Sequence, residues 1–220
     1  EDAARRSEIA PSDLVQVLVS DDGSEPSQLE RNKGVVHDYD VPMLMSSERL
    51  GIAKQWNRLV RHVPGAEICV LLNDDAEVVT DWLDVLVYSL RANPGLGMVG
   101  LRCETGVLRA AAPARPFVDF HEARLLGFGS LLASTGVCFA FRRADFDDVG
   151  GFDERYFCYY EELDFGVRLT ENFGRVHAMA SYPVIYHMGG GATHDNMDAA
   201  RILGQSREKF LAKWGPLEAV

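Results

Sequence analysis

The feature that most constrains the fold of this chain is the apolar run Ile68–Leu72, which is followed at once by Asn73-Asp74-Asp75. An unbroken apolar run of this length is typical of a strand that is buried on both faces. Acids at its carboxyl end predict a loop at the edge of a sheet, where the ligands of open α/β sheets bind. On spacing alone, an ordinary solvated turn explains these acids about equally well.

Strand-like and helix-like segments alternate along the chain, which predicts an α/β fold with a mostly parallel central sheet flanked by helices. Apolar runs predict strands over 14–19, 35–45, 68–72, 98–101, 131–141 and 176–186. Helical spacing of apolar residues predicts helices over 48–62, 82–90, 142–149, 161–172 and 197–214. We expect a single compact domain.

The composition excludes several classes of protein. With 47% hydrophobic residues the chain can build a core, and its net charge of -11 disfavours binding to nucleic acid. The four cysteines form no CxxC pair, so we expect reduced thiols and a cytoplasmic location. No apolar run reaches the ~20 residues that span a bilayer, so no transmembrane segment is expected.

A second acidic cluster, Glu161-Glu162 with Asp164 close behind, follows a run of aromatic residues. Carboxyl groups beside aromatic side chains can have a raised pKa and act as a general base. Alternatively, the acids complement the dipole at the start of a helix. Asp164 and Arg168 are four residues apart on that helix, and their simplest role is a structural ion pair.

Two further features suggest a metal site. Asp75, with Asp74 or Glu77 nearby, offers hard oxygen ligands of the kind that Mg²⁺ or Mn²⁺ prefers. His187 ends an apolar strand just before Gly189–Gly191, although a lone histidine is more often structural. His194 and Asp195 are weaker candidates in the same loop.

Taken in order, these segments resemble the family 2 glycosyltransferases of the GT-A fold, which are inverting enzymes that use nucleotide-activated sugars. The resemblance covers roughly 14–214 and is strongest in "GVCFAFRRADFDDVGGFDERYFCYYEELDFGVRL" and the later "YPVIYH". Within the family, the chain is most similar to the rhamnosyl- and galactofuranosyl-transferase-like branch. The family's first strand has no counterpart before Leu14.

The resemblance implies a role for each cluster. Residues 1–100 would form the nucleotide-sugar half and 101–220 the acceptor-binding and catalytic half. Glu162 would be the catalytic base, with Glu161 as the second choice. The metal, Mn²⁺ or Mg²⁺, would be held by Asp75 and His187. The residues implied in nucleotide binding are Asp21, Asp22, Gly51, Asn57 and Asp74, and those implied in acceptor binding are Tyr159, Tyr160 and Asp164.

The resemblance also implies the partners. The donor would be a UDP-, dTDP- or GDP-sugar, recognised in part by the loops over 103–129, and Gly189–Gly191 would close over it. The acceptor would be a cell-wall or capsular glycan, a lipid-linked saccharide or a small molecule. A lipid-linked acceptor would bring the protein to the inner face of the membrane as a peripheral contact.

Two other functions fit parts of the sequence. A degenerate GT-A domain would bind a nucleotide or glycan without turning it over, and the missing first strand favours it. A sugar-phosphate nucleotidyltransferase shares the sheet and the metal-bound acids. That enzyme would carry a glycine- and lysine- or arginine-rich phosphate loop after its first strand, and none is visible here.

Overall fold

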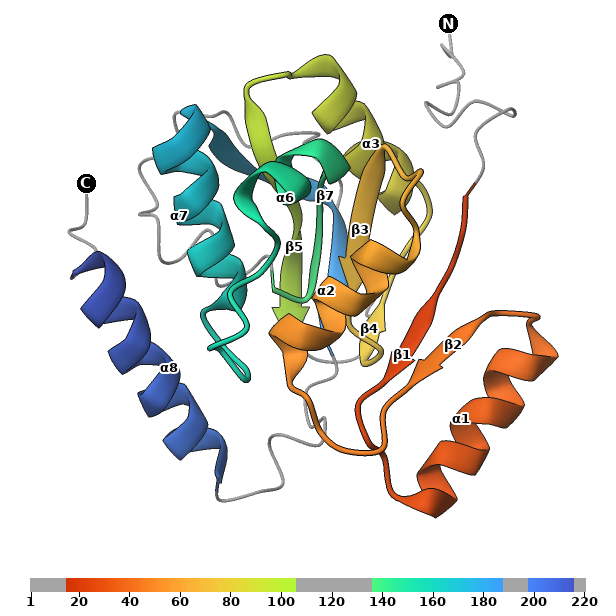
Figure 1. Ribbon diagram of the computed structural model, residues 1–220. Coiled ribbons are helices and arrows are strands. Elements are labelled where there is room, and N and C mark those ends of the chain that lie inside the picture. The colour runs from red at the N-terminus through yellow and green to blue at the C-terminus, as the bar shows by residue number, and fades with distance from the viewer. Residues whose placement is uncertain (1–14, 106–135, 188–197, 216–220) are drawn as a thin grey trace, which may run out of the picture.

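The computed structural model describes residues 15–105, 136–187 and 198–215 (Figure 1). Its elements in chain order are β1 (Val19–Asp21), α1 (Pro26–Asp38), β2 (Met43–Met45), α2 (Ile52–His62), β3 (Ile68–Leu72), β4 (Ala76–Glu77), α3 (Trp82–Ala92), β5 (Leu96–Thr105), β6 (Cys138–Arg142), α6 (Arg143–Val149), α7 (Glu161–Phe173), β7 (Val176–His187) and α8 (Asp198–Trp214). None of the helices in these ranges has both the length and the apolar composition needed to cross a bilayer.

The strands form two sheets, a five-stranded one in the order β3-β6-β5-β7-β4 and a two-stranded one of β1 and β2. β5 and β7 are parallel, whereas β6 is antiparallel to both of its neighbours, β3 and β5. β4 is antiparallel to β7. The α/β class is as predicted. The prediction of a mostly parallel sheet is wrong, because most neighbouring strands are antiparallel. The central sheet is mixed because β6 inserts in the opposite direction.

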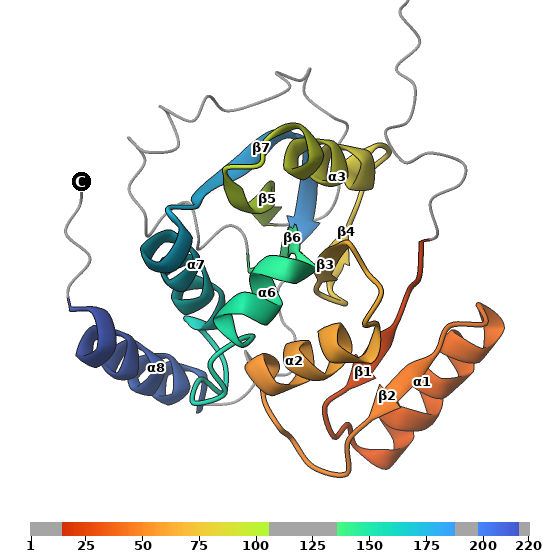
Figure 2. The same cartoon turned by 45° about the horizontal axis from the view of Figure 1, so that its top comes forward.

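β6 divides the hydrophobic interior into two cores. Successive residues of a strand point to opposite faces of a sheet. Phe139 and Phe141 belong to the core beneath α2, α6 and α7, whereas Cys138 and Ala140 belong to the core beneath α3. Figure 2 shows α2, α6 and α7 on one side of the sheet and α3 on the other. Burying each phenylalanine contributes roughly 2 kcal/mol.

The amino-terminal part differs most from the prediction. A strand was expected over 35–45, but α1 continues to Asp38 and the strand β2 spans only Met43–Met45. None of the α1 residues is buried, so the helix has no apolar stripe that could have identified it. The expected boundary between the nucleotide-sugar half and the acceptor-binding half, at residues 100 and 101, falls inside β5.

Helix α2 docks on the turn that follows α6 through a fully buried asparagine. The Asn57 Nδ2 atom donates to the Phe152 carbonyl oxygen at 2.9 Å, and the Phe152 N–H donates to Asn57 Oδ1 at 2.8 Å. Gly151 lies in the left-handed region with φ of 83°, and a Cβ atom there would meet Asn57 Oδ1 at 2.6 Å. The contact between α2 and this turn therefore requires glycine at Gly151.

We expect Gly151→Ala to destabilise the protein more than Gly150→Ala, by about 2 kcal/mol. Both glycines have a similar positive φ, 83° and 80°, but nothing lies within 4 Å of a Cβ atom at Gly150. The pair therefore separates backbone strain from the collision with Asn57. Urea denaturation of both variants measures the difference, and equal free energies of unfolding would contradict it.

Candidate active site

The predicted metal ligands Asp75 and His187 lie together at one corner of the five-stranded sheet. β4 begins just after Asp75 and pairs with the end of β7, so that Ala76 lies opposite His187. The His187 Nε2 atom is 3.0 Å from Asp75 Oδ1, and both side chains are about a quarter exposed, 23% and 24%. The strand register thus holds a carboxylate oxygen and an imidazole nitrogen side by side and open to solvent.

This pair has the chemistry of a divalent metal site. A carboxylate oxygen with an imidazole nitrogen suits Mn²⁺, and Mg²⁺ usually takes one or two carboxylates together with waters and substrate phosphates. In the described ranges, no group of three His, Cys, Asp or Glu side chains is placed to hold an ion. Asp75 and His187 are thus a pair of side chains that could hold an ion.

Two consecutive residues connect this corner to the start of α7. The Asn73 N–H donates to the Val137 carbonyl oxygen at 2.9 Å. A Cβ atom at the preceding residue, Gly136, would lie 2.9 Å from the Glu162 Oε1 atom. The backbone at Gly136 therefore packs directly against the carboxyl group of Glu162. In Figure 1 the end of β3, β4 and the start of α7 lie toward the same lower end of the sheet.

The two acids at the start of α7 are buried. Glu161 is 3% exposed and Glu162 is 9% exposed, and the Oε2 atom of each has no hydrogen-bond partner among the described residues. Burial, and then the charge of Glu162, raises the pKa of Glu161 well above its usual range. Burial raises the pKa of Glu162 to about 7, against the opposing effect of backbone N–H groups at the helix start. Such a carboxyl group is matched to proton abstraction near neutral pH.

The burial of Glu162 also predicts how stability depends on pH. Because its folded pKa is raised to about 7, stability falls as pH rises from the unfolded pKa through that value. We expect Glu162→Gln to raise the free energy of unfolding at high pH by on the order of 2 kcal/mol, and to change it little at low pH.

Urea denaturation on both sides of this range measures the effect, with the exposed Glu171→Gln on the same helix as the control. If Glu162→Gln gave the same difference from the wild type at both pH values, the proposed burial penalty would be wrong.

Two of the three acids predicted to contact the nucleotide, Asp21 and Asp22, already accept hydrogen bonds within the protein. The Asp22 carboxylate accepts hydrogen bonds from the Leu50 N–H at 2.6 Å and the Gly51 N–H at 3.0 Å. These bonds hold the chain in a turn, which is why α2 begins at Ile52 and the helix expected over 48–62 starts late. The Asp21 carboxylate accepts from the Ser24 N–H at 3.0 Å.

Asn57 is not placed to bind a nucleotide. It is 0% exposed, and its amide is bonded to both backbone groups of Phe152. This corrects its predicted role to a structural one. Gly51 does face the cavity described below, but a Cβ atom there would meet the Phe157 carbonyl oxygen at 2.5 Å. Its contact with a nucleotide stays a prediction, and the close approach to Phe157 already explains the glycine.

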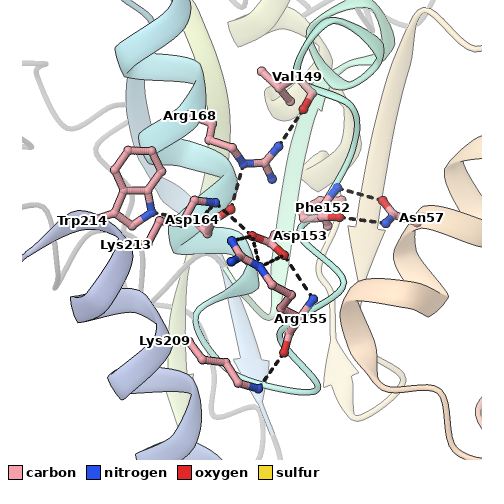
Figure 3. A network of polar contacts seen from close by, with 10 residues as sticks. All are labelled: Asn57, Val149, Phe152, Asp153, Arg155, Asp164, Arg168, Lys209, Lys213 and Trp214. Atoms are coloured by element: carbon pink, nitrogen blue, oxygen red, sulfur yellow. Dashed lines mark hydrogen bonds and ion pairs between the residues drawn. The ribbon is translucent and has the colours of Figure 1, made fainter.

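Asp164 is not placed to bind an acceptor either. It is 0% exposed, and its carboxylate accepts hydrogen bonds from Arg168 Nε at 2.8 Å, Lys213 Nζ at 2.6 Å and Trp214 Nε1 at 2.8 Å (Figure 3). The structural ion pair with Arg168 was the alternative that the spacing favoured. Tyr159 and Tyr160 are partly exposed, so their contact with an acceptor stays a prediction.

The sequence did not indicate Gly136 or Gln55 as site residues. Gln55 is 6% exposed, and its Nε2 atom donates to Asp22 Oδ1 at 2.7 Å beside the cavity. In the sequence, the feature that could have indicated Gln55 is its position next to the apolar stripe of α2. The loop Gly189–Gly191, with His194 and Asp195, lies outside the described residues, as does most of 103–129.

Part of the site borders a cavity of 1990 Å³, whose lining includes Asp75 but neither His187 nor Glu162. It runs from the segment around Val15 and Val17, past β3, to the acidic turn after β3 and the first half of α8. Five of the predicted site residues line this cavity, and all five lie at the ends of strands or helices. Of the predicted set, the cavity is lined by Asp21, Asp22, Gly51, Asp74 and Asp75 together with the neighbouring Asn73.

Comparison with known families identifies the chain. A model described as Glycosyl transferase family 2 matches residues 2–150, which is more than half of the 220 residues. The chain belongs to glycosyl transferase family 2. The resemblance read from the motifs is thereby confirmed at the level of the family.

Curated relatives of this family 2 chain are longer proteins. The O-antigen biosynthesis protein RfbC of Myxococcus xanthus is 30% identical over 152 residues, which are 61% of this chain and 12% of that protein. An N-acetylglucosaminyl-diphospho-decaprenol L-rhamnosyltransferase of Mycobacterium tuberculosis is 39% identical over 78 residues, 36% of this chain and 25% of that protein. The chain thus matches a minor part of each relative's length.

Solved structures confirm the GT-A fold. The mannosyltransferase PcManGT of Pyrobaculum calidifontis, in complex with GDP-Man and Mn²⁺, has a TM-score of 0.62 at 23% identity, over 90% of this chain and 55% of that one. GalNAc-T7 with UDP, GalNAc and Mn²⁺ also has a TM-score of 0.62, at 13% identity, over 93% and 45% of the two chains.

Proposed function

We propose that this chain transfers a sugar, with inversion, from a nucleotide-diphosphate donor to an acceptor hydroxyl group, with the help of Mn²⁺ or Mg²⁺. One observation carries the proposal: the Asp75–His187 pair and the buried Glu162 lie at the same end of the sheet, connected through Asn73, Val137 and Gly136. Metal ligands on one side of a site and a base on the other are what such a transfer requires.

Asp75 and His187 are the residues that would hold the ion. When bound, a divalent ion neutralises the charge that develops on the departing diphosphate. Two solved structures with a similar fold contain Mn²⁺ together with GDP-Man or with UDP, which supports a nucleotide-sugar donor here. The nucleotide would lie along the cavity wall that contains Asp21, Asp22 and Asp74.

Glu162 would accept the proton of the acceptor hydroxyl as its oxygen attacks the anomeric carbon. Its Oε2 atom has no hydrogen-bond partner among the described residues and is the atom available for this proton. With a pKa raised to about 7, the group is a stronger base than an exposed glutamate and is still partly ionised at neutral pH. Gly136 leaves the carboxyl group its space, because a Cβ atom there would press on Oε1.

For the acceptor we propose a glycan or a lipid-linked saccharide. One relative is named for O-antigen biosynthesis and another for transfer to a decaprenol-linked sugar. Tyr159 precedes the buried acids in the chain and is partly exposed, and its ring would stack on an acceptor sugar. A rhamnose donor is the first to test, because the mycobacterial relative is named a rhamnosyltransferase.

Glu162→Gln tests the base. We expect kcat to fall by about 10²- to 10⁴-fold, because the amide cannot take the proton, while the affinity for the donor nucleotide stays the same. Transfer from a panel of UDP-, dTDP- and GDP-sugars, followed by mass spectrometry, measures the loss. Exposed Glu171→Gln is the control, and unchanged turnover in Glu162→Gln would show that the base lies elsewhere.

Asp75→Ala tests the metal site. Wild-type protein should show an increase in Tm with UDP or dTDP that grows when Mn²⁺ is added, and Asp75→Ala should lose the part that depends on Mn²⁺. Exposed Asp38→Ala is the control for a lost surface charge. Absence of nucleotide binding under every metal condition would contradict the enzyme proposal. Binding without any donor turnover would instead identify a degenerate binding module.

A further inference from the structure

One face of α8 docks on the last turn of chain before α7. Ser206, Phe210 and Trp214 recur every four residues and therefore share a face of the helix. The buried Ser206 hydroxyl donates to the Cys158 carbonyl oxygen at 2.7 Å. The ring of Phe210 packs on Tyr160 with 5.2 Å between the ring centroids. This docking face therefore contacts the chain immediately in front of the buried acids.

The far end of the same face is tied to α7 itself. Asp164 lies in the first turn of α7, and two of the three donors to its buried carboxylate, Lys213 and Trp214, come from α8 (Figure 3). Lys213 also bonds Asp153 Oδ2 at 3.0 Å. Removing one partner of a buried charge is strongly unfavourable, so α8 cannot separate from α7 without leaving Asp164 short of donors.

The turn held in this way has an unfavourable backbone conformation. Tyr159 and Tyr160 have φ angles of 69° and 71°, in the left-handed region that side chains other than glycine rarely occupy. Such residues persist only where surrounding contacts determine them. α8 supplies contacts on one side, and on the other the Ile52 N–H donates to the Phe157 carbonyl oxygen at 2.7 Å. The result is a fixed entry into α7, which begins with Glu161.

The first half of α8 faces a different part of the molecule. Its residues there line the large cavity, whereas the docking face belongs mainly to the second half. The cavity-lining residues of α8 are Asp198, Ala199, Arg201, Ile202 and Gln205. One helix therefore forms a wall of the cavity and the anchor of the helix that carries the acids.

We infer that α8 is the positioning element for the proposed base: through Asp164, Lys213 and Trp214 it keeps the start of α7, and with it Glu162, in the orientation that packs on Gly136. The inference rests on the proposed role of Glu162. Asp164, Lys213 and Trp214 act through α7, and so they are positioning residues and not catalytic ones.

The groups around Glu162 indicate how its pKa would change if the start of α7 could move. Among the described residues, the titratable groups that interact electrostatically with it are Glu161 on the same helix and Cys158 in the turn before it. Burial is the largest cause of the raised pKa of Glu162. If α8 lets the start of α7 move, water reaches the carboxyl group and its pKa falls toward the ordinary range of glutamate.

Lys213→Met tests this positioning role, with kcat and KM measured across a pH series. In the wild type the acid limb of kcat should lie near the Glu162 pKa of about 7. In Lys213→Met we expect the limb to move to lower pH by at least about half a unit and kcat to fall by about tenfold, because a weaker base remains. The donor KM should change by less than about twofold, because the metal corner is untouched.

Three comparisons make the result specific. Lys213→Arg keeps the cation and should restore the wild-type pH profile. Arg207→Met removes a cation from the exposed side of the same helix and should change nothing. Trp214→Phe removes the N–H donor, keeps an aromatic ring of smaller size, and replaces Lys213→Met if that variant does not fold. A lower Tm with an unchanged acid limb in these variants would show that α8 has a merely structural role.

A second readout does not depend on turnover. The pKa of Glu162 can be followed by ¹³C NMR of its side-chain carboxyl group in the wild type and in Lys213→Met. A lower pKa in the variant supports the positioning role even if Glu162→Gln retains full activity, in which case only the assignment of the base is wrong. An identical pKa in both proteins would overturn the inference.

Discussion

The structure depends first on the pairing of β6 between β3 and β5. Because its side chains alternate between the two faces, this one strand supplies aromatic rings to one core and small side chains to the other. The same pairing fixes the chain just before β6, where Val137 accepts a hydrogen bond from Asn73 and Gly136 packs on Glu162. Core packing and site geometry therefore cannot be changed independently at this strand.

The sequence predicted the parts of the fold that are set locally. The strand Ile68–Leu72 is confirmed, as is the helix expected over 161–172, which spans Glu161–Phe173 and is capped by the left-handed Gly174. Apolar runs and such a glycine are local signals. The direction of β6 is not local, since it depends on which strands it joins. Helix α1 was missed because it has no buried stripe. The family was recognised from the order of motifs, which reflects the whole chain.

The site residues divide in the same way, into those that the sequence indicated and those whose role depends on distant contacts. The approach of Asp75 and His187 follows from strand register, and the order of motifs indicated it. Asn57 and Asp164 were assigned to ligands. Asn57 instead bonds a distant backbone, and Asp164 bonds a distant helix in addition to the Arg168 that the spacing indicated. Burying two adjacent acids at the start of α7 lowers stability near neutral pH, and proteins keep such costly arrangements where chemistry needs them.

The separation of the two sheets has a consequence for how this protein behaves among other molecules. In the described ranges β1 is paired only with β2, and β3 only with β6. The cavity between them is bordered by Val15 and Val17, which are 54% and 58% exposed. A strand edge flanked by valines offers backbone groups to any extended chain of another molecule. Among the described strands, this edge is where an extended segment could add through main-chain hydrogen bonds.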